Sequence, residues 1–226
     1  MALAIFDLDN TLIHGDSDFL WGQFLIHKNA VDPAFYEQAN HQFHQDYLNG
    51  TLDIMQYQRF SLAPLTQYDL PTLNAWREAF VTDWIRPIYQ HNAQAVVDTH
   101  RERGDTLLII TATNSFITRP IAEMYGIPHL IGTDPEIING RFTGEFLGTP
   151  SFQDGKITRL HQWLENRPDL SLEGSYFYSD SHNDLPLLAQ VSHPYVVDGD
   201  PTLRNEAKVR AWPCLSFQAS LQTTPD

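Results

Sequence analysis

Short apolar runs that alternate with helical patterns constrain the fold of this chain more than any other feature. Four runs have the character of buried strands: Leu3–Phe6, Thr106–Thr111, Tyr176–Ser179 and Tyr195–Val197. Other segments have apolar residues three and four positions apart, as helices do: roughly Ala93–Arg103, Ser115–Tyr125, Asp154–Glu165, Asp184–Gln190 and Pro201–Lys208. Asn139-Gly140 predicts a β-hairpin within residues 132–145. The alternation predicts an α/β fold, a parallel sheet with helices on both faces.

The segment from about Asp16 to Tyr89 departs from this alternation. It shows helical spacing without a strand pattern, in Phe19–Ile26, Phe35–Leu48 and Leu73–Trp84. Turn signals punctuate it at Asp32-Pro33, Asn49-Gly50 and Leu70-Pro71. We therefore expect a core domain formed by residues 1–15 and 90–226, with residues 16–89 as a helical insertion. Its aromatic residues are expected to form the core of that insertion.

Composition limits the partners and the location. The net charge of −14 over 226 residues disfavours nucleic acid and anionic membranes as partners. Cys214 is the single cysteine, so no internal disulfide is possible, and we expect this small apolar residue to be buried. No run approaches the roughly 18 apolar residues of a membrane span, and the N-terminus lacks the features of a signal peptide. These observations favour a cytoplasmic protein, and they leave its oligomeric state open.

Polar side chains follow three of the four apolar runs. They are Asp7 and Asp9 after the first, Thr111, Thr113 and Asn114 at the end of the second, and Asp180, Asn183 and Asp184 after the third. The carboxyl ends of parallel strands meet at one edge of a sheet, where ligands bind. Taken singly, the hydroxyl and amide groups could be helix caps. Two further Asp-x-Asp pairs occur, and Asp200-Pro201 in the last of them indicates a helix start.

Lys156 stands at the expected start of a helix, in the stretch QDGKITRL. A cation there opposes the helix dipole, so a nearby phosphate or carboxylate would explain it, although a solvated surface lysine would also fit. Several carboxylates at one sheet edge resist ionisation unless a cation lies among them. Oxygen ligands of this kind suit Mg²⁺, which commonly takes one or two carboxylates and a phosphate oxygen. The pattern therefore predicts a metal and phosphate site.

Four motifs together resemble those of the haloacid-dehalogenase-like phosphatases. Asp7-Leu8-Asp9-Asn10-Thr11 resembles the D-x-D-x-T motif of that family, Thr111 its second-strand hydroxyl, Lys156 its lysine, and Asp180 with Asp184 its acidic fourth motif. The resemblance spans residues 5–190. It implies a Rossmann-like core with an inserted helical cap of the C1 type, as in the phosphoserine-phosphatase branch.

The resemblance also implies roles for the catalytic residues. Asp7 would be the nucleophile and form an aspartyl-phosphate. Asp9 would protonate the leaving oxygen and then deprotonate the attacking water. Thr111 and Lys156 would hold the phosphoryl oxygens and offset their charge.

A Mg²⁺ site is implied at the same edge of the sheet. Its ligands would be Asp7, the backbone carbonyl of Asp9, and Asp180. Asn183 and Asp184 would support them from nearby positions.

The substrate is expected to be a small phosphate ester. The chain resembles most a bacterial group that includes histidinol-phosphate phosphatases, which implies histidinol phosphate; phosphoserine or another small amine phosphate is the alternative. Two differences argue against phosphoserine as the substrate. Asp16 stands where the phosphoserine phosphatases have a glutamate, and Thr111-Ala112-Thr113 stands where they have Ser-Gly-Gly.

Ala112 and Thr113, at the end of the second strand, and residues of the insertion are candidates for substrate binding. Asp16, Asp18 and Trp21 could meet a cationic amine or imidazolium, and Arg59 could match the family's substrate arginine. Alternatively, Asp16 and Asp18 are an acidic first helical turn, and Arg59 is an exposed helical residue. His41 and His44 have ligand-like spacing, but a zinc site is not expected without a third ligand nearby.

Two other classes of protein compete with the enzyme. A non-catalytic receiver-type domain also gathers aspartates, a hydroxyl and a lysine at a sheet edge, but it has little use for the insertion or for Asp9. A structural protein with a degenerate metal site is the second rival. The complete set of motif residues argues against it.

Overall fold

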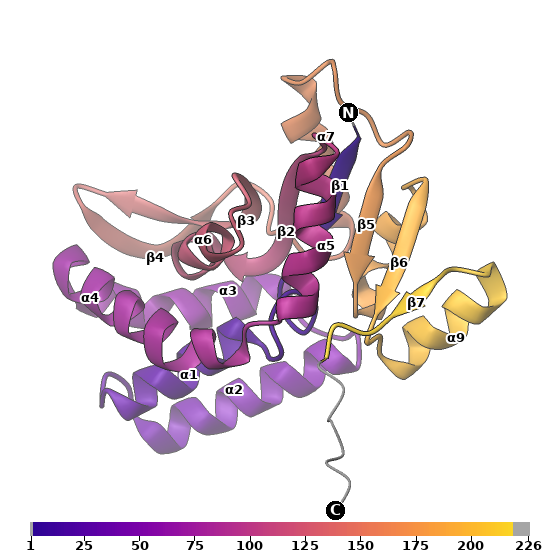
Figure 1. Ribbon diagram of the computed structural model, residues 1–226. Helices are drawn as coiled ribbons and strands as arrows, with labels where there is room; N and C mark the ends of the chain where they lie inside the picture. Colours follow the sequence, from indigo (N-terminus) through magenta and orange to yellow (C-terminus); the bar gives the residue numbers. More distant parts are fainter. Residues whose placement is uncertain (1, 219–226) are drawn as a thin grey trace, which may run out of the picture.

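The computed structural model describes residues 2–218. A seven-stranded sheet has the order β4-β3-β2-β1-β5-β6-β7 (Figure 1). The strands are β1 (Leu3–Phe6), β2 (Thr106–Asn114), β3 (His129–Ile138), β4 (Arg141–Leu147), β5 (Tyr176–Ser179), β6 (His193–Val197) and β7 (Cys214–Leu215). All neighbours pair in parallel except β3 and β4, which form the antiparallel hairpin predicted at Asn139-Gly140.

Helices cover both faces of this sheet, which confirms the predicted α/β class. The alternation of side chains in β1 sends Ala4 and Phe6 into one apolar cluster and Leu3 and Ile5 into another. The first cluster includes residues of α5 (His91–Glu102) and α6 (Ser115–Met124). The second includes residues of α7 (Asp154–Glu165), α8 (Leu185–Leu188) and α9 (Pro201–Arg210).

Residues 16–89, called the cap segment below, contain no strand of the sheet. Its α-helices are α1 (Ser17–His27), α2 (Pro33–Leu48), α3 (Ile54–Leu62) and α4 (Leu70–Phe80). A 3-10 helix (Ala63–Gln67) precedes α4, and a π-helix (Val81–Ile85) and a second 3-10 helix (Arg86–Ile88) follow it. Each α-helix begins after an aspartate whose carboxylate accepts backbone N–H groups of the first turn: Asp16, Asp32, Asp53 and Asp69.

The cap segment lies beyond the carboxyl ends of β1 and β2, in the lower part of Figure 1. Trp21 and Phe24 of α1 and Phe80 of α4 belong to the same apolar cluster as Phe6 of β1 and Ile109 of β2. Burial of a large apolar side chain contributes about 1.5–3 kcal/mol. The cap segment is therefore held to the sheet by a continuous apolar core. The division into two domains at residues 15/16 and 89/90 remains a proposal.

Several predicted elements change in detail. The helix expected over Leu73–Trp84 begins at Leu70, because Asp69 caps it, and turns into a π-helix at Val81. The helix expected over Asp184–Gln190 is a 3-10 turn (His182–Asp184) followed by the four-residue α8. Three elements were not anticipated: α3, β7 and the parallel part of β3.

The expectation that Cys214 is buried is wrong. Cys214 is exposed because it lies on β7, a two-residue strand at the edge of the sheet. Within residues 2–218, none of the helices has the length and hydropathy that a membrane crossing requires.

Candidate active site

The turn after β1 places two carboxylates at the carboxyl edge of the sheet. The backbone N–H of Asp7 still donates to the carbonyl of Tyr178 at 2.9 Å, so Asp7 continues the pairing of β1 with β5. The chain then turns tightly: the N–H of Leu12 donates to the carbonyl of Leu8 at 2.9 Å, and Asn10 has a φ of 56°. Asn tolerates this left-handed conformation better than most residues. Asp7 and Asp9 both line one cavity as a result.

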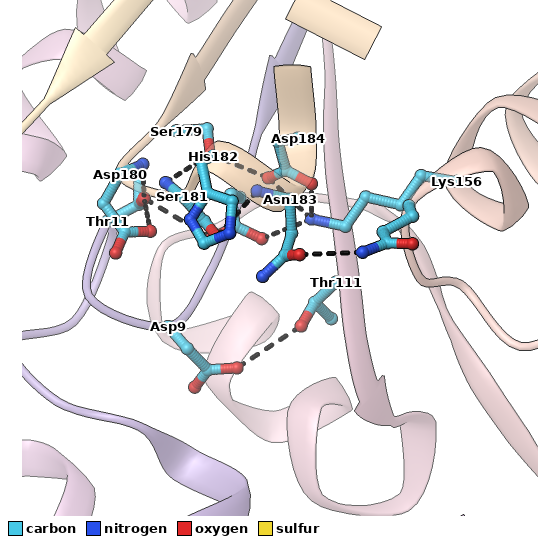
Figure 2. Close-up of polar contacts among 12 residues, drawn as sticks. Asp9, Thr11, Thr111, Lys156, Ser179, Asp180, Ser181, His182, Asn183 and Asp184 are labelled. Carbon is cyan, nitrogen blue, oxygen red and sulfur yellow. Dashed lines mark hydrogen bonds and ion pairs between the residues drawn. The ribbon is translucent and has the colours of Figure 1, made fainter. Parts of the chain in front are cut away.

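Lys156 bridges two buried carboxylates. Its Nζ lies 2.8 Å from Oδ1 of Asp7. It also lies 2.7 Å from Oδ1 of Asp184, and Figure 2 shows the side chains of Lys156 and Asp184 side by side. Burial lowers the pKa of Lys156, but the charges of Asp184 and Asp7 outweigh it, so the net pKa lies above its ordinary value. Lys156 therefore stays cationic. The predicted anionic partner of this lysine is a pair of carboxylates.

The start of α7 fixes the position of Lys156. Gln153, just before the helix, has a φ of 47°, and Lys156 donates its backbone N–H to the Gln153 carbonyl at 3.0 Å. A Cβ on Gly155 would lie 2.1 Å from the carbonyl oxygen of Pro150. Only glycine fits at this close approach of two backbone segments.

Asp7 is buried and has a raised pKa. Burial raises the pKa of Asp7 from 3.8 to about 7, against the lowering effect of Lys156 and with the further raising effect of Asp184 and Asp9. Its second carboxylate oxygen lies 3.5 Å from the Thr11 hydroxyl. A cation or a proton would relieve this charge.

Asp9 is held from two sides. Its Oδ1 accepts from the N–H (2.6 Å) and the hydroxyl (2.5 Å) of Ser17. Its Oδ2 accepts from the hydroxyls of Thr113 (2.8 Å) and Thr111 (3.4 Å). Burial and the charge of Asp16 raise the pKa of Asp9 to about 6, although the hydrogen bonds from Ser17 and Thr113 oppose them. A carboxyl group with such a pKa can donate and accept a proton near neutral pH.

Two further carboxylates come from the end of β5. Oδ1 of Asp180 accepts from the Thr11 hydroxyl at 3.2 Å, and Oδ2 of Asp184 accepts from the Ser179 hydroxyl at 2.7 Å. Burial, with repulsion from Asp7 and Asp184, raises the pKa of Asp180 well above its ordinary value. Asp7, Asp180 and Asp184 thus gather more negative charge than Lys156 alone neutralises.

This donor set fits a Mg²⁺ ion. Among the described residues, no three His, Cys, Asp or Glu side chains are grouped closely enough to hold a metal ion by themselves. Mg²⁺ does not need three, because it keeps several waters and uses only one or two carboxylates. Burial and the repulsion between neighbouring carboxylates raise the pKa of both Asp7 and Asp180, so a bound cation would stabilise their ionised forms.

The loop after β5 is also tied to α2 and α9. The Tyr47 hydroxyl donates to the Ser181 hydroxyl at 3.2 Å, and the Asn183 amide donates to the Tyr47 carbonyl at 3.2 Å. The His182 ring lies 2.9 Å from Asp200, which is also the N-cap of α9, as its sequence predicts. These contacts fix the loop that carries Asp180 and Asp184.

The cavity extends from these carboxylates to the cap segment. Its wall combines core residues with these residues of the cap segment: Asp16, Asp18, Phe19, Asn40, Phe43, His44, Tyr47, Leu52, Ile54 and Tyr57. Of the substrate-binding residues expected from the sequence, Asp16, Asp18, Ala112 and Thr113 line it.

Trp21 and Arg59 do not line the cavity. Trp21 is buried and packs on the rings of Phe24 and Phe80, with ring centroids 5.2 and 5.1 Å apart, so it belongs to the core. Arg59 is half exposed, and its Nε lies 3.1 Å from Glu145 of β4. Trp21 is thus part of the core, and Arg59 is an exposed residue of a helix, as the alternative interpretations of the sequence expected.

Sequence reasoning missed several residues of the site. Ser17 and Thr11 hold Asp9 and Asp180, and Tyr47 and Tyr57 line the cavity. The amide of Gln58 donates to the carbonyl of Ala112 at 3.1 Å and so joins α3 to the end of β2. Thr11, as the last residue of the D-x-D-x-T motif, carried a signal; the residues of α2 and α3 carried none, because their packing on the sheet decides where they point.

Comparisons with known proteins agree with this geometry. The family model described as haloacid dehalogenase-like hydrolase matches residues 4–189. A histidinol-phosphatase from Neisseria meningitidis serogroup C is 47% identical over 219 residues, 96% of this chain and 99% of that protein. A phosphoserine phosphatase from Mycobacterium tuberculosis is 28% identical, over 96% of this chain and 71% of its own length.

Solved structures share the fold. A protein with unknown function from Bordetella pertussis Tohama I superposes with a TM-score of 0.89 at 44% identity, over 96% of this chain and 99% of that one. A substrate-bound phosphoserine phosphatase superposes with a TM-score of 0.70 at 16% identity, over 95% of this chain and 92% of that one, which shows the fold alone. Four motifs converge on one cavity, a family model matches most of the chain, and a near relative is a phosphatase. The chain therefore belongs to the haloacid dehalogenase-like hydrolases and is one of their phosphatases.

Proposed function

We propose that this phosphatase is a Mg²⁺-dependent phosphomonoesterase that hydrolyses histidinol phosphate through an aspartyl-phosphate on Asp7. The contact that carries the proposal is that of Lys156 with Asp7 and Asp184, beside Asp9 in one cavity. A carboxylate can approach a phosphate dianion only where cations offset the charge of both.

Two displacements at phosphorus complete the reaction. An oxygen of Asp7 attacks phosphorus and the bond to the ester oxygen breaks, while Asp9 gives its proton to that oxygen so that the alcohol leaves. Asp9 then takes a proton from a water molecule, which attacks phosphorus and releases phosphate and the free Asp7 carboxylate. The pKa of Asp9, about 6, suits both proton transfers.

Lys156 and Thr111 are placed to act on the phosphoryl oxygens. Both line the cavity with Asp7. Lys156 remains charged, and the Thr111 hydroxyl is a donor that can turn from Asp9 to the substrate, because its 3.4 Å contact is long. They would stabilise the charge that spreads over these oxygens during transfer.

A Mg²⁺ ion would be held by Asp7, Asp180 and the backbone carbonyl of Asp9, with Asn183 and Asp184 in support. When bound, it supplies positive charge that neutralises the phosphoryl group and the carboxylates around it. Asn183 is already oriented by Gln153, whose amide donates to it at 2.9 Å.

Histidinol phosphate is favoured as substrate because the relative with 47% identity over nearly both full lengths is a histidinol-phosphatase. Phosphoserine or another small amine phosphate is the alternative. The cavity under α1, α2 and α3 suits a small ester in either case. A receiver-type domain would not need Asp9, which accepts four hydrogen bonds in the cavity that it lines together with Asp7.

Phosphate release from a panel of small esters tests this proposal. The panel contains histidinol phosphate, phosphoserine, phosphoethanolamine and p-nitrophenyl phosphate, each with Mg²⁺ and then with excess chelator. We expect release that requires the metal and is fastest from histidinol phosphate. Equal rates with chelator would contradict the metal requirement, and a long-lived phospho-aspartate without turnover would favour the receiver-type alternative.

A further inference from the structure

The cap segment places a carboxylate without a cationic partner in the cavity wall. Asp18, in the first turn of α1, is 7% exposed and lines the cavity. Its Oδ1 accepts from the Ser61 hydroxyl of α3 at 3.2 Å, and the Tyr57 hydroxyl is a second donor. None of the ion pairs within residues 2–218 includes Asp18.

Asp16, two residues earlier, is already engaged. One oxygen accepts from the backbone N–H groups of Asp18 and Phe19 and caps α1. The other lies 3.5 Å from the ring of His44, which stacks near Phe19. Asp18 therefore differs from Asp16, because its charge has hydroxyl partners only, and burying a charge without a cation is costly.

Few cationic groups of residues 2–218 line the cavity, and each already faces a carboxylate of the protein. The hydrogen bond with Asp16 raises the pKa of His44, whose ring lies 3.5 Å from Asp16. Lys156 is the one Lys or Arg among the described residues that line the cavity, and Lys156 faces Asp7 and Asp184 at the phosphoryl end. A substrate such as phosphoserine would bring its carboxylate next to Asp16 and Asp18. An ester whose remaining charge is a single ammonium group would instead complement the wall.

We infer that Asp18 binds the ammonium group of the substrate and thereby selects amine phosphates that carry no carboxylate. The inference rests on the proposed function and deepens it, since it names the class of substrate. An alkylammonium with a pKa near about 10 is charged at neutral pH, so it supplies the missing cation. Phe19, Phe43 and Tyr57 line the cavity on the same helices and provide apolar and aromatic surface for the rest of the ester.

Binding without turnover tests this inference directly. Asp7→Asn removes the nucleophile, so the affinity for intact esters can be measured by calorimetry. The Asp7→Asn protein is compared with the double variant Asp7→Asn/Asp18→Asn, using histidinol phosphate, phosphoserine and inorganic phosphate. Loss of a charge-assisted hydrogen bond should raise Kd for histidinol phosphate about tenfold to a hundredfold relative to Kd for inorganic phosphate.

Asp7→Asn/Asp53→Asn is the matched control. Asp53 caps α3, the helix that carries Tyr57 and Ser61, but it is exposed. The exchange removes the same charge, and Asn is an equally good cap. The ratio of Kd for histidinol phosphate to Kd for inorganic phosphate should therefore stay within about twofold of the ratio measured for the Asp7→Asn protein.

Two results would overturn the inference. The first is a ratio of Kd for histidinol phosphate to Kd for inorganic phosphate that is the same in Asp7→Asn/Asp18→Asn as in Asp7→Asn. The second is equal affinity of the Asp7→Asn protein for phosphoserine and histidinol phosphate. Neither depends on catalysis. If the wild-type protein releases phosphate from no ester while the Asp18 effect on binding is present, the proposed reaction fails and the amine site stands.

Discussion

At the scale of single residues, buried charge dominates the site. Lys156 contacts Asp7 and Asp184 within hydrogen-bonding distance, and all three are buried. Breaking a buried ion pair by removing one partner is strongly destabilising, because the remaining charge has lost its compensation. The lysine therefore supports the fold as well as the proposed chemistry.

Lys156→Met should abolish turnover and lower the free energy of unfolding by about 3–5 kcal/mol at pH 8. The loss should shrink toward pH 5, where the carboxylates released from Lys156 take up protons. Urea unfolding at both pH values measures it, with exposed Lys208→Met in α9 as the control. Equal stability of wild type and Lys156→Met at pH 8 would mean that the ion pairs contribute nothing.

Asp18→Asn should stabilise the protein at alkaline pH. Burial and the charge of Asp16 raise the pKa of Asp18 from 3.8 to about 7 in the folded protein. The folded state thus binds this proton more tightly than the unfolded state, so its contribution to stability is full below about pH 4 and is lost as the pH rises to about 7.

The Asp18→Asn variant has no carboxyl group at this position, so it does not lose stability in this way as the pH rises. Its stability relative to wild type should therefore rise between pH 4 and pH 8, by about 1–4 kcal/mol. Melting temperatures of both proteins across this range provide the measurement. A difference that does not vary with pH would show that Asp18 is not a strained carboxylate.

The sequence allowed the convergence of Asp7, Asp9, Thr111 and Asp180 to be predicted, because parallel strands bring their carboxyl ends to one edge. Lys156 stands at a helix start, and its place in the site was implied by the family resemblance. In the structure Asp7, Asp9, Thr111 and Lys156 line one cavity. Asp180 does not line it, but the Thr11 hydroxyl contacts both Asp180 and Asp7. Trp21 and Arg59 could not be placed from the sequence, since each lies on a helix whose buried face depends on its neighbours in space.

At the scale of elements, the packing of the first turn of α7 against the segment before it sets the position of Lys156. Gly155 precedes the lysine and approaches the carbonyl of Pro150 too closely for any side chain. The start of α7 is therefore fixed by backbone packing rather than by a capping side chain; Gln153 at the cap position makes no side-chain hydrogen bond.

Gly155→Ala should lower the free energy of unfolding by about 1–3 kcal/mol, because the new methyl group forces the two segments apart. It should also lower kcat, by up to about a hundredfold, because Lys156 moves with the helix start. Thr158→Ala, exposed on the same helix, is the control. A Gly155→Ala enzyme with wild-type kcat would show that this close approach does not position the lysine.

Strands with continuous apolar runs could be predicted, since their signal is local. The helix α3 and the parallel part of β3 could not. The helix α3 has nine residues, fewer than the roughly 11–18 over which a helical period is read, and β3 passes from parallel pairing with β2 to antiparallel pairing with β4 within one strand. The edge strand β7 has two residues, too few for a pattern.

At the scale of the whole molecule, one apolar cluster joins the cap segment to the sheet. Trp21, Phe24 and Phe80 of the cap segment share it with Phe6 and Ile109 of the strands. Separation of the two parts would expose these side chains to water, at about 25 cal/mol for each Å² of apolar surface. The sequence predicted a helical insertion. It did not show that the apolar residues of this insertion pack in one cluster with those of the sheet.

We therefore expect the cap segment and the sheet to unfold in urea as one cooperative unit. Replacing Trp163 and Trp212 by Phe leaves Trp21, Trp76 and Trp84 as reporters of the cap segment. Their fluorescence and the far-UV circular dichroism of the whole chain should give the same midpoint. A fluorescence change at lower urea would indicate a cap segment that unfolds on its own.

Covalent phosphorylation of Asp7 would be direct evidence that this residue is the nucleophile. The enzyme is mixed with histidinol phosphate and Mg²⁺, quenched in acid within one turnover, and digested for mass spectrometry. We expect a phosphoryl group on the peptide that contains Asp7 and none on that peptide in Asp7→Asn. The variant should show no turnover, although its circular dichroism matches that of wild type. Turnover by folded Asp7→Asn protein, or phosphate on another residue, would contradict it.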